Sequence, residues 1–61
     1  MCEFNVILNG KNLFKDVVYV KTENNTVKAK NIFGETKEFN NCEITEVDVN
    51  STRLVLTSLK T

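Results

Sequence analysis

The chain has 61 residues and a mass of 7.0 kDa, which is enough for one small domain and no more. Eight basic residues balance eight acidic ones, so the formal net charge of zero removes the simplest argument for nucleic-acid binding, a strongly basic domain. Histidine is absent and the carboxylates are scattered, so we expect a protein that is not an enzyme. No apolar stretch approaches the roughly 20 residues of a membrane span and no signal peptide is recognisable, so we expect a soluble, cytoplasmic protein.

The first third of the chain predicts two strands joined by a tight turn. Val, Ile and Thr make up 18 of the 61 residues, and β-branched side chains favour strands over helices. Residues 2–8 alternate between two faces, and Asn9-Gly10 fits a type I′ turn. Residues 11–20 end in an apolar β-branched run and predict a second strand. Their apolar spacing also fits one helical turn near residues 12–16, which stays as an alternative.

The middle of the chain predicts three further strands. Residues 26–30 alternate between small apolar and basic side chains, and a turn at residues 32–35 leads into a strand at residues 36–40. In the next run, residues 43–49, the alternation slips by one position. This slip predicts a β-bulge or a sharp bend near Thr45-Glu46.

The last run, residues 53–59, carries apolar residues on both faces. This pattern fits either a contact with a second chain or burial within the monomer beneath a loop. Together the six predicted strands follow one another at intervals of about ten residues, a spacing that is typical of an antiparallel barrel or sandwich. We therefore predict one all-β domain spanning residues 1–61.

Cys2 is the strongest candidate for a functional residue. The initiator Met1 is usually removed when the second residue is as small as cysteine. Cys2 then becomes the N-terminus and carries both an α-amine and a thiol. These donors close a five-membered chelate on a metal ion, and the deprotonated backbone amide of Glu3 can add a third donor. Nickel(II) and copper(II) favour such tetragonal sites, and two chains could contribute ligands to one ion. The competing interpretation is a buried apolar side chain, because Cys2 alternates in register with Phe4.

Cys42 is the second cysteine, and packing in the core is the favoured interpretation of it. A reducing cytosol argues against a disulfide with Cys2. A tetrahedral zinc site built from Cys2 and Cys42 of two chains is the alternative.

The chain as a whole resembles the CooT family. The resemblance rests on the opening Met1-Cys2-Glu3-Phe4-Asn5-Val6 and on four later segments, residues 17–20, 32–35, 46–49 and 53–56. The family is named for a nickel-binding accessory protein of carbon monoxide dehydrogenase maturation. The resemblance therefore implies a small SH3-like β-barrel, a homodimer, nickel(II) bound through Cys2, and a nickel enzyme such as carbon monoxide dehydrogenase as partner. It assigns no role to Cys42.

RNA binding is the alternative function. Members of the family have been described as predicted RNA-binding proteins, and small β-barrels bind RNA through exposed aromatic side chains and a basic groove. Lys28 and Lys30 share a strand face, and Lys21, Lys37 and Arg53 could join them in the fold. The same lysines also fit an ordinary solvated face that discourages edge pairing.

Overall fold

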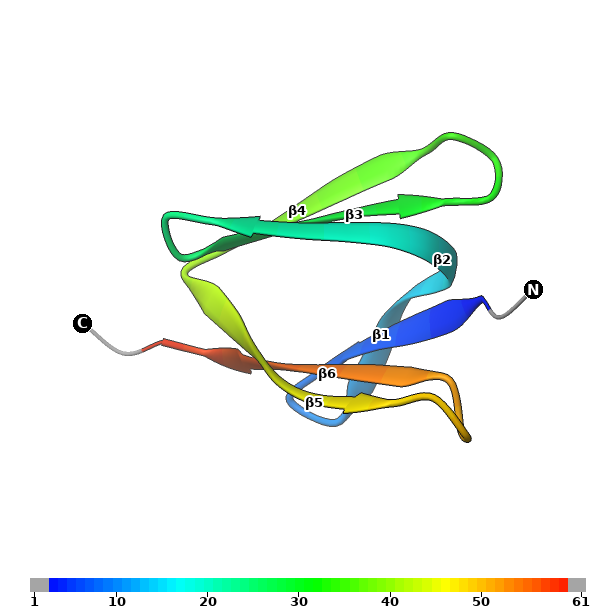
Figure 1. Cartoon of the computed structure of the whole chain (residues 1–61). Coiled ribbons are helices and arrows are strands. Elements are labelled where there is room, and N and C mark those ends of the chain that lie inside the picture. The colour runs from blue at the N-terminus through cyan, green and yellow to red at the C-terminus, as the bar shows by residue number, and fades with distance from the viewer. Residues whose placement is uncertain (1–2, 60–61) are drawn as a thin grey trace.

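The computed structural model describes residues 3–59, and all six predicted strands are present in it (Figure 1). The strands are β1 (Phe4–Leu8), β2 (Lys11–Glu23), β3 (Thr26–Asn31), β4 (Thr36–Asn40), β5 (Cys42–Asp48) and β6 (Arg53–Ser58). The all-β prediction is confirmed. The helical turn considered for residues 12–16 is wrong, since β2 runs through that segment. Within residues 3–59 no helix is long and apolar enough to cross a membrane.

The strands form one sheet in the order β4-β3-β2-β1-β6-β5. Four of its pairings are antiparallel as predicted, but β1 and β6 are parallel, with Val6 opposite Leu54 and Leu8 opposite Leu56. The two edge strands, β4 and β5, are not paired with each other in the described part of the chain, so a closed SH3-like barrel is not confirmed. Since β6 lies between β1 and β5, it is not free to pair with another chain.

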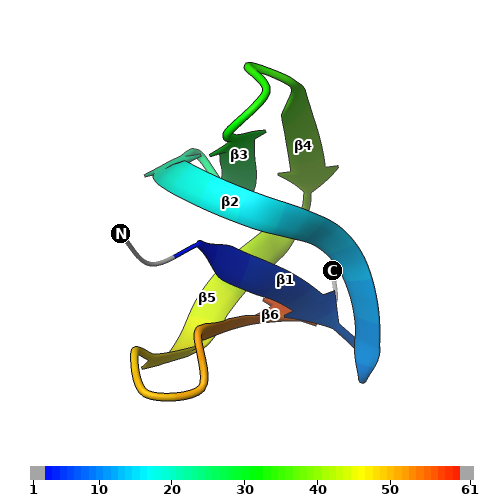
Figure 2. The same ribbon diagram turned by 90° about the vertical axis from the view of Figure 1, so that its right-hand side faces the viewer.

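A bend in β2 allows this one strand to serve both halves of the sheet. Its first part pairs with β1 and its second part with β3, and the register shifts on both sides of Val17. Asp16 at this point has a φ of 58°, in the left-handed region that a short polar side chain tolerates better than most. Figures 1 and 2 show the result, a long curved strand that turns the β3–β4 hairpin over the β1–β6–β5 layer.

Asparagine makes the tight turns. Asn9 and Gly10 have φ values of 53° and 77°, the two positive values that a type I′ turn requires, as predicted. Asn24 and Asn25 repeat this pattern between β2 and β3, with 49° and 62°. These turns fix the strand register without needing buried side chains.

One face of the bent sheet encloses the core. Its buried apolar residues are Val6, Val17, Val27, Ala29, Phe39, Cys42, Leu54 and Leu56. Val27 and Ala29 point inward together, as the alternation of β3 predicts. The bulge expected near Thr45 is present, since the β5–β6 register shifts between Ile44 and Glu46.

Truncation of Leu56 should show how much of the stability this small core supplies. Leu56 is 1% exposed, so Leu56→Ala should lower the free energy of unfolding by about 2–5 kcal/mol, through lost apolar burial and a cavity. The total free energy of unfolding expected for a chain of this length is roughly 3–9 kcal/mol. Urea denaturation followed by circular dichroism measures the change. The matched control is Leu13→Ala, at a side chain that is 38% exposed, and equal losses in the two variants would contradict the assignment of the core.

Candidate functional site

The predicted metal residues lie at the start of the chain. Cys2 lies outside the described residues, so the structure does not test the prediction made for it. Glu3 is partly buried and directly precedes β1. Within residues 3–59, no group of three or more His, Cys, Asp or Glu side chains is placed so that it could hold a metal ion.

β1 begins at an end of the molecule where several large apolar residues are exposed. Figure 2 looks onto this end, with the β3–β4 turn at its top, the β5–β6 turn at its bottom, and β2 and the start of β1 between them. We call it the apolar end and define it by six large apolar residues that are each 44–72% exposed: Val18, Tyr19, Ile32, Phe33, Val47 and Val49. A groove of about 170 Å³ opens here, with Phe4 and Leu54 in its lining between Val18 and Val47. The apolar end therefore combines projecting side chains with a small apolar groove.

Asn31 fixes the turn that carries the most exposed of these side chains, Phe33. The Asn31 side chain is buried, and its Oδ1 accepts the backbone N–H groups of Phe33 and Glu35, both at 3.0 Å. Its Nδ2 donates to the Glu35 carboxylate at 2.7 Å, and the backbone N–H of Ile32 donates to the Asp16 carbonyl at 2.9 Å. The turn is thus held from both sides while Phe33 stays 72% exposed. The sequence predicts the turn, but it does not show that Phe33 points outward.

The β5–β6 turn supports the chain start from the other side. The backbone N–H of Asn5 donates to the Thr52 carbonyl at 2.8 Å, and Thr52 has a φ of 53°, which is rare for a β-branched residue. Asp48 closes the turn by accepting the N–H groups of Asn50 and Ser51 at 3.1 and 3.3 Å. Hydrogen bonds from Ser51, through its hydroxyl and its backbone N–H, lower the pKa of Asp48 from the usual value of 3.8.

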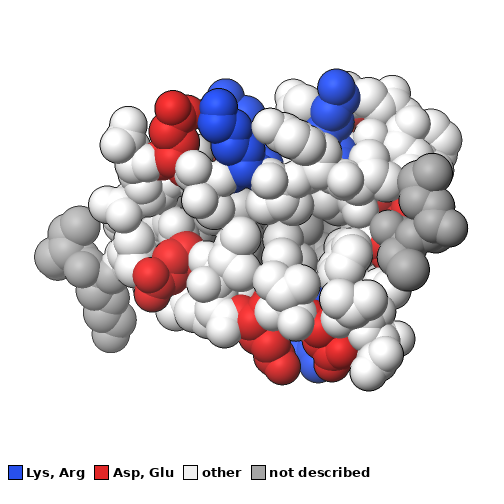
Figure 3. Space-filling model, in the orientation of Figure 1, with Lys and Arg blue, Asp and Glu red and all other residues white. Residues whose placement is uncertain are grey.

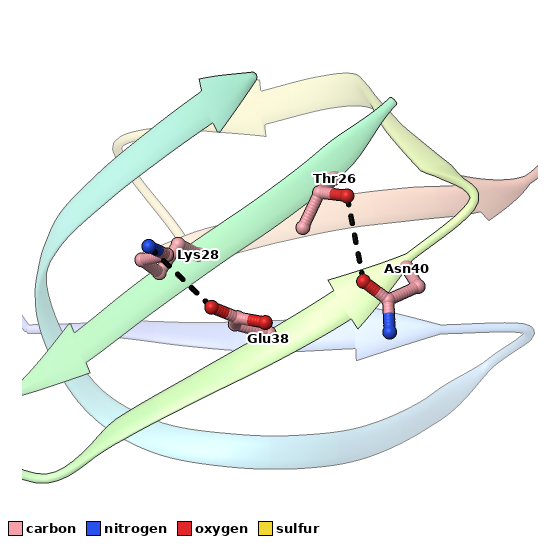
Figure 4. Close-up of polar contacts among 4 residues, drawn as sticks. All are labelled: Thr26, Lys28, Glu38 and Asn40. Atoms are coloured by element: carbon pink, nitrogen blue, oxygen red, sulfur yellow. Dashed lines mark hydrogen bonds and ion pairs between the residues drawn. The ribbon is translucent and has the colours of Figure 1, made fainter. Parts of the chain in front are cut away.

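The outer face of β2, β3 and β4 brings three of the predicted basic residues together. Lys21 lies directly opposite Lys28, and Lys30 lies opposite the half-exposed ring of Tyr19. Lys28 also forms an ion pair with Glu38 at 3.4 Å (Figure 4). At the top of Figure 3, basic side chains lie beside an acidic one over this part of the sheet, so the face is mixed in charge rather than purely basic.

A shallow hollow of about 240 Å³ lies on the same face. Its lining includes the Lys28–Glu38 pair and the hydrogen bond of 3.4 Å from the Thr26 hydroxyl to the Asn40 side chain (Figure 4). The other lining residues are one further uncharged side chain, Asn24, and two residues of opposite charge, Lys21 and Glu23. The hollow therefore offers a polar surface with no strong charge of either sign.

Lys37 and Arg53, the other two basic residues considered for this face, do not lie on it. Lys37 is opposite the buried Ala29, and its Nζ lies 5.9 Å from the centre of the Phe14 ring and donates to the Leu13 carbonyl at 3.5 Å. Arg53 lies opposite Asp48 on β5. Neither joins Lys28 and Lys30, as the sequence allowed, because the alternation of β4 directs Lys37 to the other face and β6 lies in the other half of the sheet.

Cys42 is a core residue. Its side chain is 5% exposed, and its thiol donates to the Asn40 carbonyl at 3.4 Å. The packing interpretation is confirmed. A zinc site that uses this thiol is not supported, since a thiolate ligand must be reachable by the ion.

Comparisons with known proteins identify relatives along nearly the whole chain. A family model described as the CO dehydrogenase accessory protein CooT matches residues 1–57. The chain is also 34% identical over 56 residues to the uncharacterized protein MJ1551 of Methanocaldococcus jannaschii, an alignment that covers 92% of this chain and 96% of that protein. The matched segment includes both predicted metal residues and all of β1–β5.

The lowered pKa of Asp48 predicts a pH-dependent contribution of the β5–β6 turn to stability. In the unfolded chain the pKa of Asp48 is near 3.8, and above this pH the ionised carboxylate contributes its full stabilisation to the fold. The contribution is lost as the pH falls through the lower pKa that Asp48 has in the folded state. Wild type should therefore be more stable than Asp48→Asn at pH 7, and the difference should vanish in strong acid. Urea denaturation across this pH range measures it. Asn50→Ala keeps the N–H that Asp48 accepts and should leave the pH profile unchanged; a difference between wild type and Asp48→Asn that persists at every pH would contradict the prediction.

Proposed function

The chain belongs to the CooT family of CO dehydrogenase accessory proteins, and from this membership we propose that it binds nickel(II) and assists the maturation of a nickel enzyme. Carbon monoxide dehydrogenase is the client that the family description supports. The same description, of an accessory protein rather than of the enzyme itself, agrees with the expectation that the chain is not an enzyme. The protein would act in the cytoplasm, where reducing conditions keep a thiol free.

The proposed nickel ligands are the amine and thiolate of Cys2 and the backbone amide of Glu3. The observation that supports this assignment is that the family model matches the chain from residue 1, so the matched segment includes Cys2 and Glu3. The donor chemistry agrees, because adjacent nitrogen and sulfur donors on one short segment suit the tetragonal geometry that nickel(II) favours. The first strand begins at Phe4, so these donors directly precede a rigid element.

We further propose that the protein acts as a homodimer. Three donors from one chain leave a position on a tetragonal ion, and a second chain can supply a ligand for it. The edge strands β4 and β5 lack a strand partner on one side in the described part of the chain. Unpaired edges of this kind are a common means of association between identical chains.

Replacement of Cys2 tests the nickel proposal. Protein whose loss of Met1 has been verified by mass spectrometry is titrated with nickel(II) under reducing conditions, and the thiolate-to-metal charge-transfer band is recorded. Cys2→Ser should abolish the band and most of the affinity without changing the circular dichroism. Cys42→Ala is the matched control and should keep both, because that thiol is buried. Undiminished binding by Cys2→Ser would defeat the proposal, and native mass spectrometry gives the number of chains per nickel ion.

RNA binding is the second candidate, and the gathering of Lys21, Lys28 and Lys30 around Tyr19 on one face favours it. Like charges placed directly opposite each other, as Lys21 and Lys28 are, destabilise a sheet, so an anion between them would be favourable. The exposed ring of Tyr19 could stack on a base. Glu23 and Glu38 on the same face oppose this function, which is why it ranks second.

Loss of Lys21 and Lys28 together tests the RNA alternative. A fluorescently labelled single-stranded RNA of mixed sequence is titrated by anisotropy at several salt concentrations. If the face binds phosphates, the double variant Lys21→Ala/Lys28→Ala should flatten the slope of log K against log salt by about 1.4, or about 0.7 for each lost phosphate contact. The control is Lys11→Ala, at an exposed lysine at the start of β2. An equal effect of the control, or no salt-dependent binding by wild type, would argue against RNA as the ligand.

A further inference from the structure

We propose that Asn9, in the turn between β1 and β2, is a site of spontaneous modification, at which the side-chain amide is lost and the residue becomes aspartate or isoaspartate. The inference is independent of the proposed nickel function. It rests on the Asn9-Gly10 pair, on the backbone N–H of Gly10, and on the short strand pairing next to the turn.

The reaction needs only these two residues and water. The backbone nitrogen of Gly10 gives up its proton and forms a bond to Cγ of Asn9, while the bond from Cγ to the amide nitrogen breaks and ammonia leaves. Water then opens the cyclic imide. Cleavage between Cγ and the ring nitrogen gives aspartate, and cleavage at the main-chain carbonyl gives isoaspartate, in which the main chain runs through Cβ and Cγ.

Gly10 leaves its backbone nitrogen open to this reaction. Glycine has no side chain that crowds the nitrogen, and nothing lies within 4 Å of the place where a Cβ on Gly10 would stand. Both residues of the turn are exposed. Within residues 3–59 the N–H of Gly10 donates no backbone hydrogen bond, so no carbonyl holds its proton.

Asn50-Ser51 is the natural comparison, because both residues are exposed and the residue after the asparagine is again small. There the N–H of Ser51 donates to Oδ1 of Asp48 at 3.3 Å. This hydrogen bond fixes the turn and keeps the nitrogen from attacking Cγ of Asn50. The seven other asparagines of the chain each precede a residue larger than serine. Asn9 is therefore the asparagine with the least protection.

The turn must open before the ring can close, and the pairing beside it is short. The first residue of a type I′ turn has a ψ of about +30°, which holds the Gly10 nitrogen away from Cγ of Asn9. Only two regular strand pairs, between residues 7–8 and 11–12, separate this turn from the nearest register shift, whereas five adjoin the turn at residues 24–25. Local opening costs least free energy where few backbone hydrogen bonds must break.

The two products should differ in their effect on the fold. Isoaspartate adds one atom to the main chain of a two-residue turn, and the length of such a turn sets the register of the strands that it joins. Aspartate followed by glycine suits the same turn. Either product adds one negative charge to a chain whose formal net charge is zero, so the isoelectric point falls below the sequence value of about 6.2.

Incubation of the folded protein in mildly alkaline buffer tests the inference. Isoelectric focusing follows the new acidic species, and tandem mass spectrometry of proteolytic peptides locates each mass gain of about 1 Da. Asn9 should react at least about tenfold faster than Asn50, because the nitrogen that attacks it is uncrowded and holds no acceptor. The matched control is Asn9→Gly, which keeps a sequence suited to a type I′ turn but has no amide to lose, and the main acidic species should be absent from it.

The products are then isolated by ion exchange, and methylation by a protein isoaspartate methyltransferase identifies the isoaspartate form. This form should unfold at a lower urea concentration than the unmodified protein, and the aspartate form should not. Equal rates at Asn9 and Asn50, an undiminished acidic species in Asn9→Gly, or a reaction that takes place only in urea would overturn the modification site. Equal urea midpoints of the two products would overturn the effect assigned to the length of the turn.

Discussion

The fold depends on β2, the one strand that pairs with both halves of the sheet. If β2 ran straight, β3 and β4 would extend the β1–β6–β5 layer as a flat, single-layer sheet with no enclosed core. The bend at Asp16 instead turns the β3–β4 hairpin over that layer, so that Val27 and Ala29 pack in the same cluster as Leu54 and Leu56. The same bend places Val18 and Tyr19 at the surface and supplies the Asp16 carbonyl that holds the β3–β4 turn.

Local features of the fold were predictable from the sequence, and long-range features were not. The Asn-Gly turn, the alternation of β3 and the bulge near Thr45 are set by neighbouring residues, so the pattern of apolar residues is enough to find them. The parallel pairing of β1 with β6 and the open edges at β4 and β5 join segments that are far apart in the chain. Alternation of side chains carries no information about which strands become neighbours, so the expected antiparallel, closed arrangement was not obtained in full.

The candidate sites also differ in whether they depend on local sequence or on long-range contacts. The donor chemistry of Cys2 and Glu3 belongs to two adjacent residues and can be derived without a fold. The exposed residues of the apolar end come from β2, the β3–β4 turn, the end of β5 and the turn after it, and each of these segments taken alone has a pattern that also fits buried core. For the basic residues, the sequence suggested a cluster that is larger than the one in the structure. The sequence allowed Lys37 to lie beside Lys28, but Lys37 lies over the Phe14 ring, because a strand directs successive side chains to opposite faces.

A chain this small has few apolar side chains to distribute between its core and its surface. The structure buries eight of them and leaves six large ones exposed at one end, although a chain of this length is expected to have a free energy of unfolding of only about 3–9 kcal/mol. Enclosing those six would strengthen the core, and no stability is gained by leaving them in water. Stability alone therefore does not account for the apolar end.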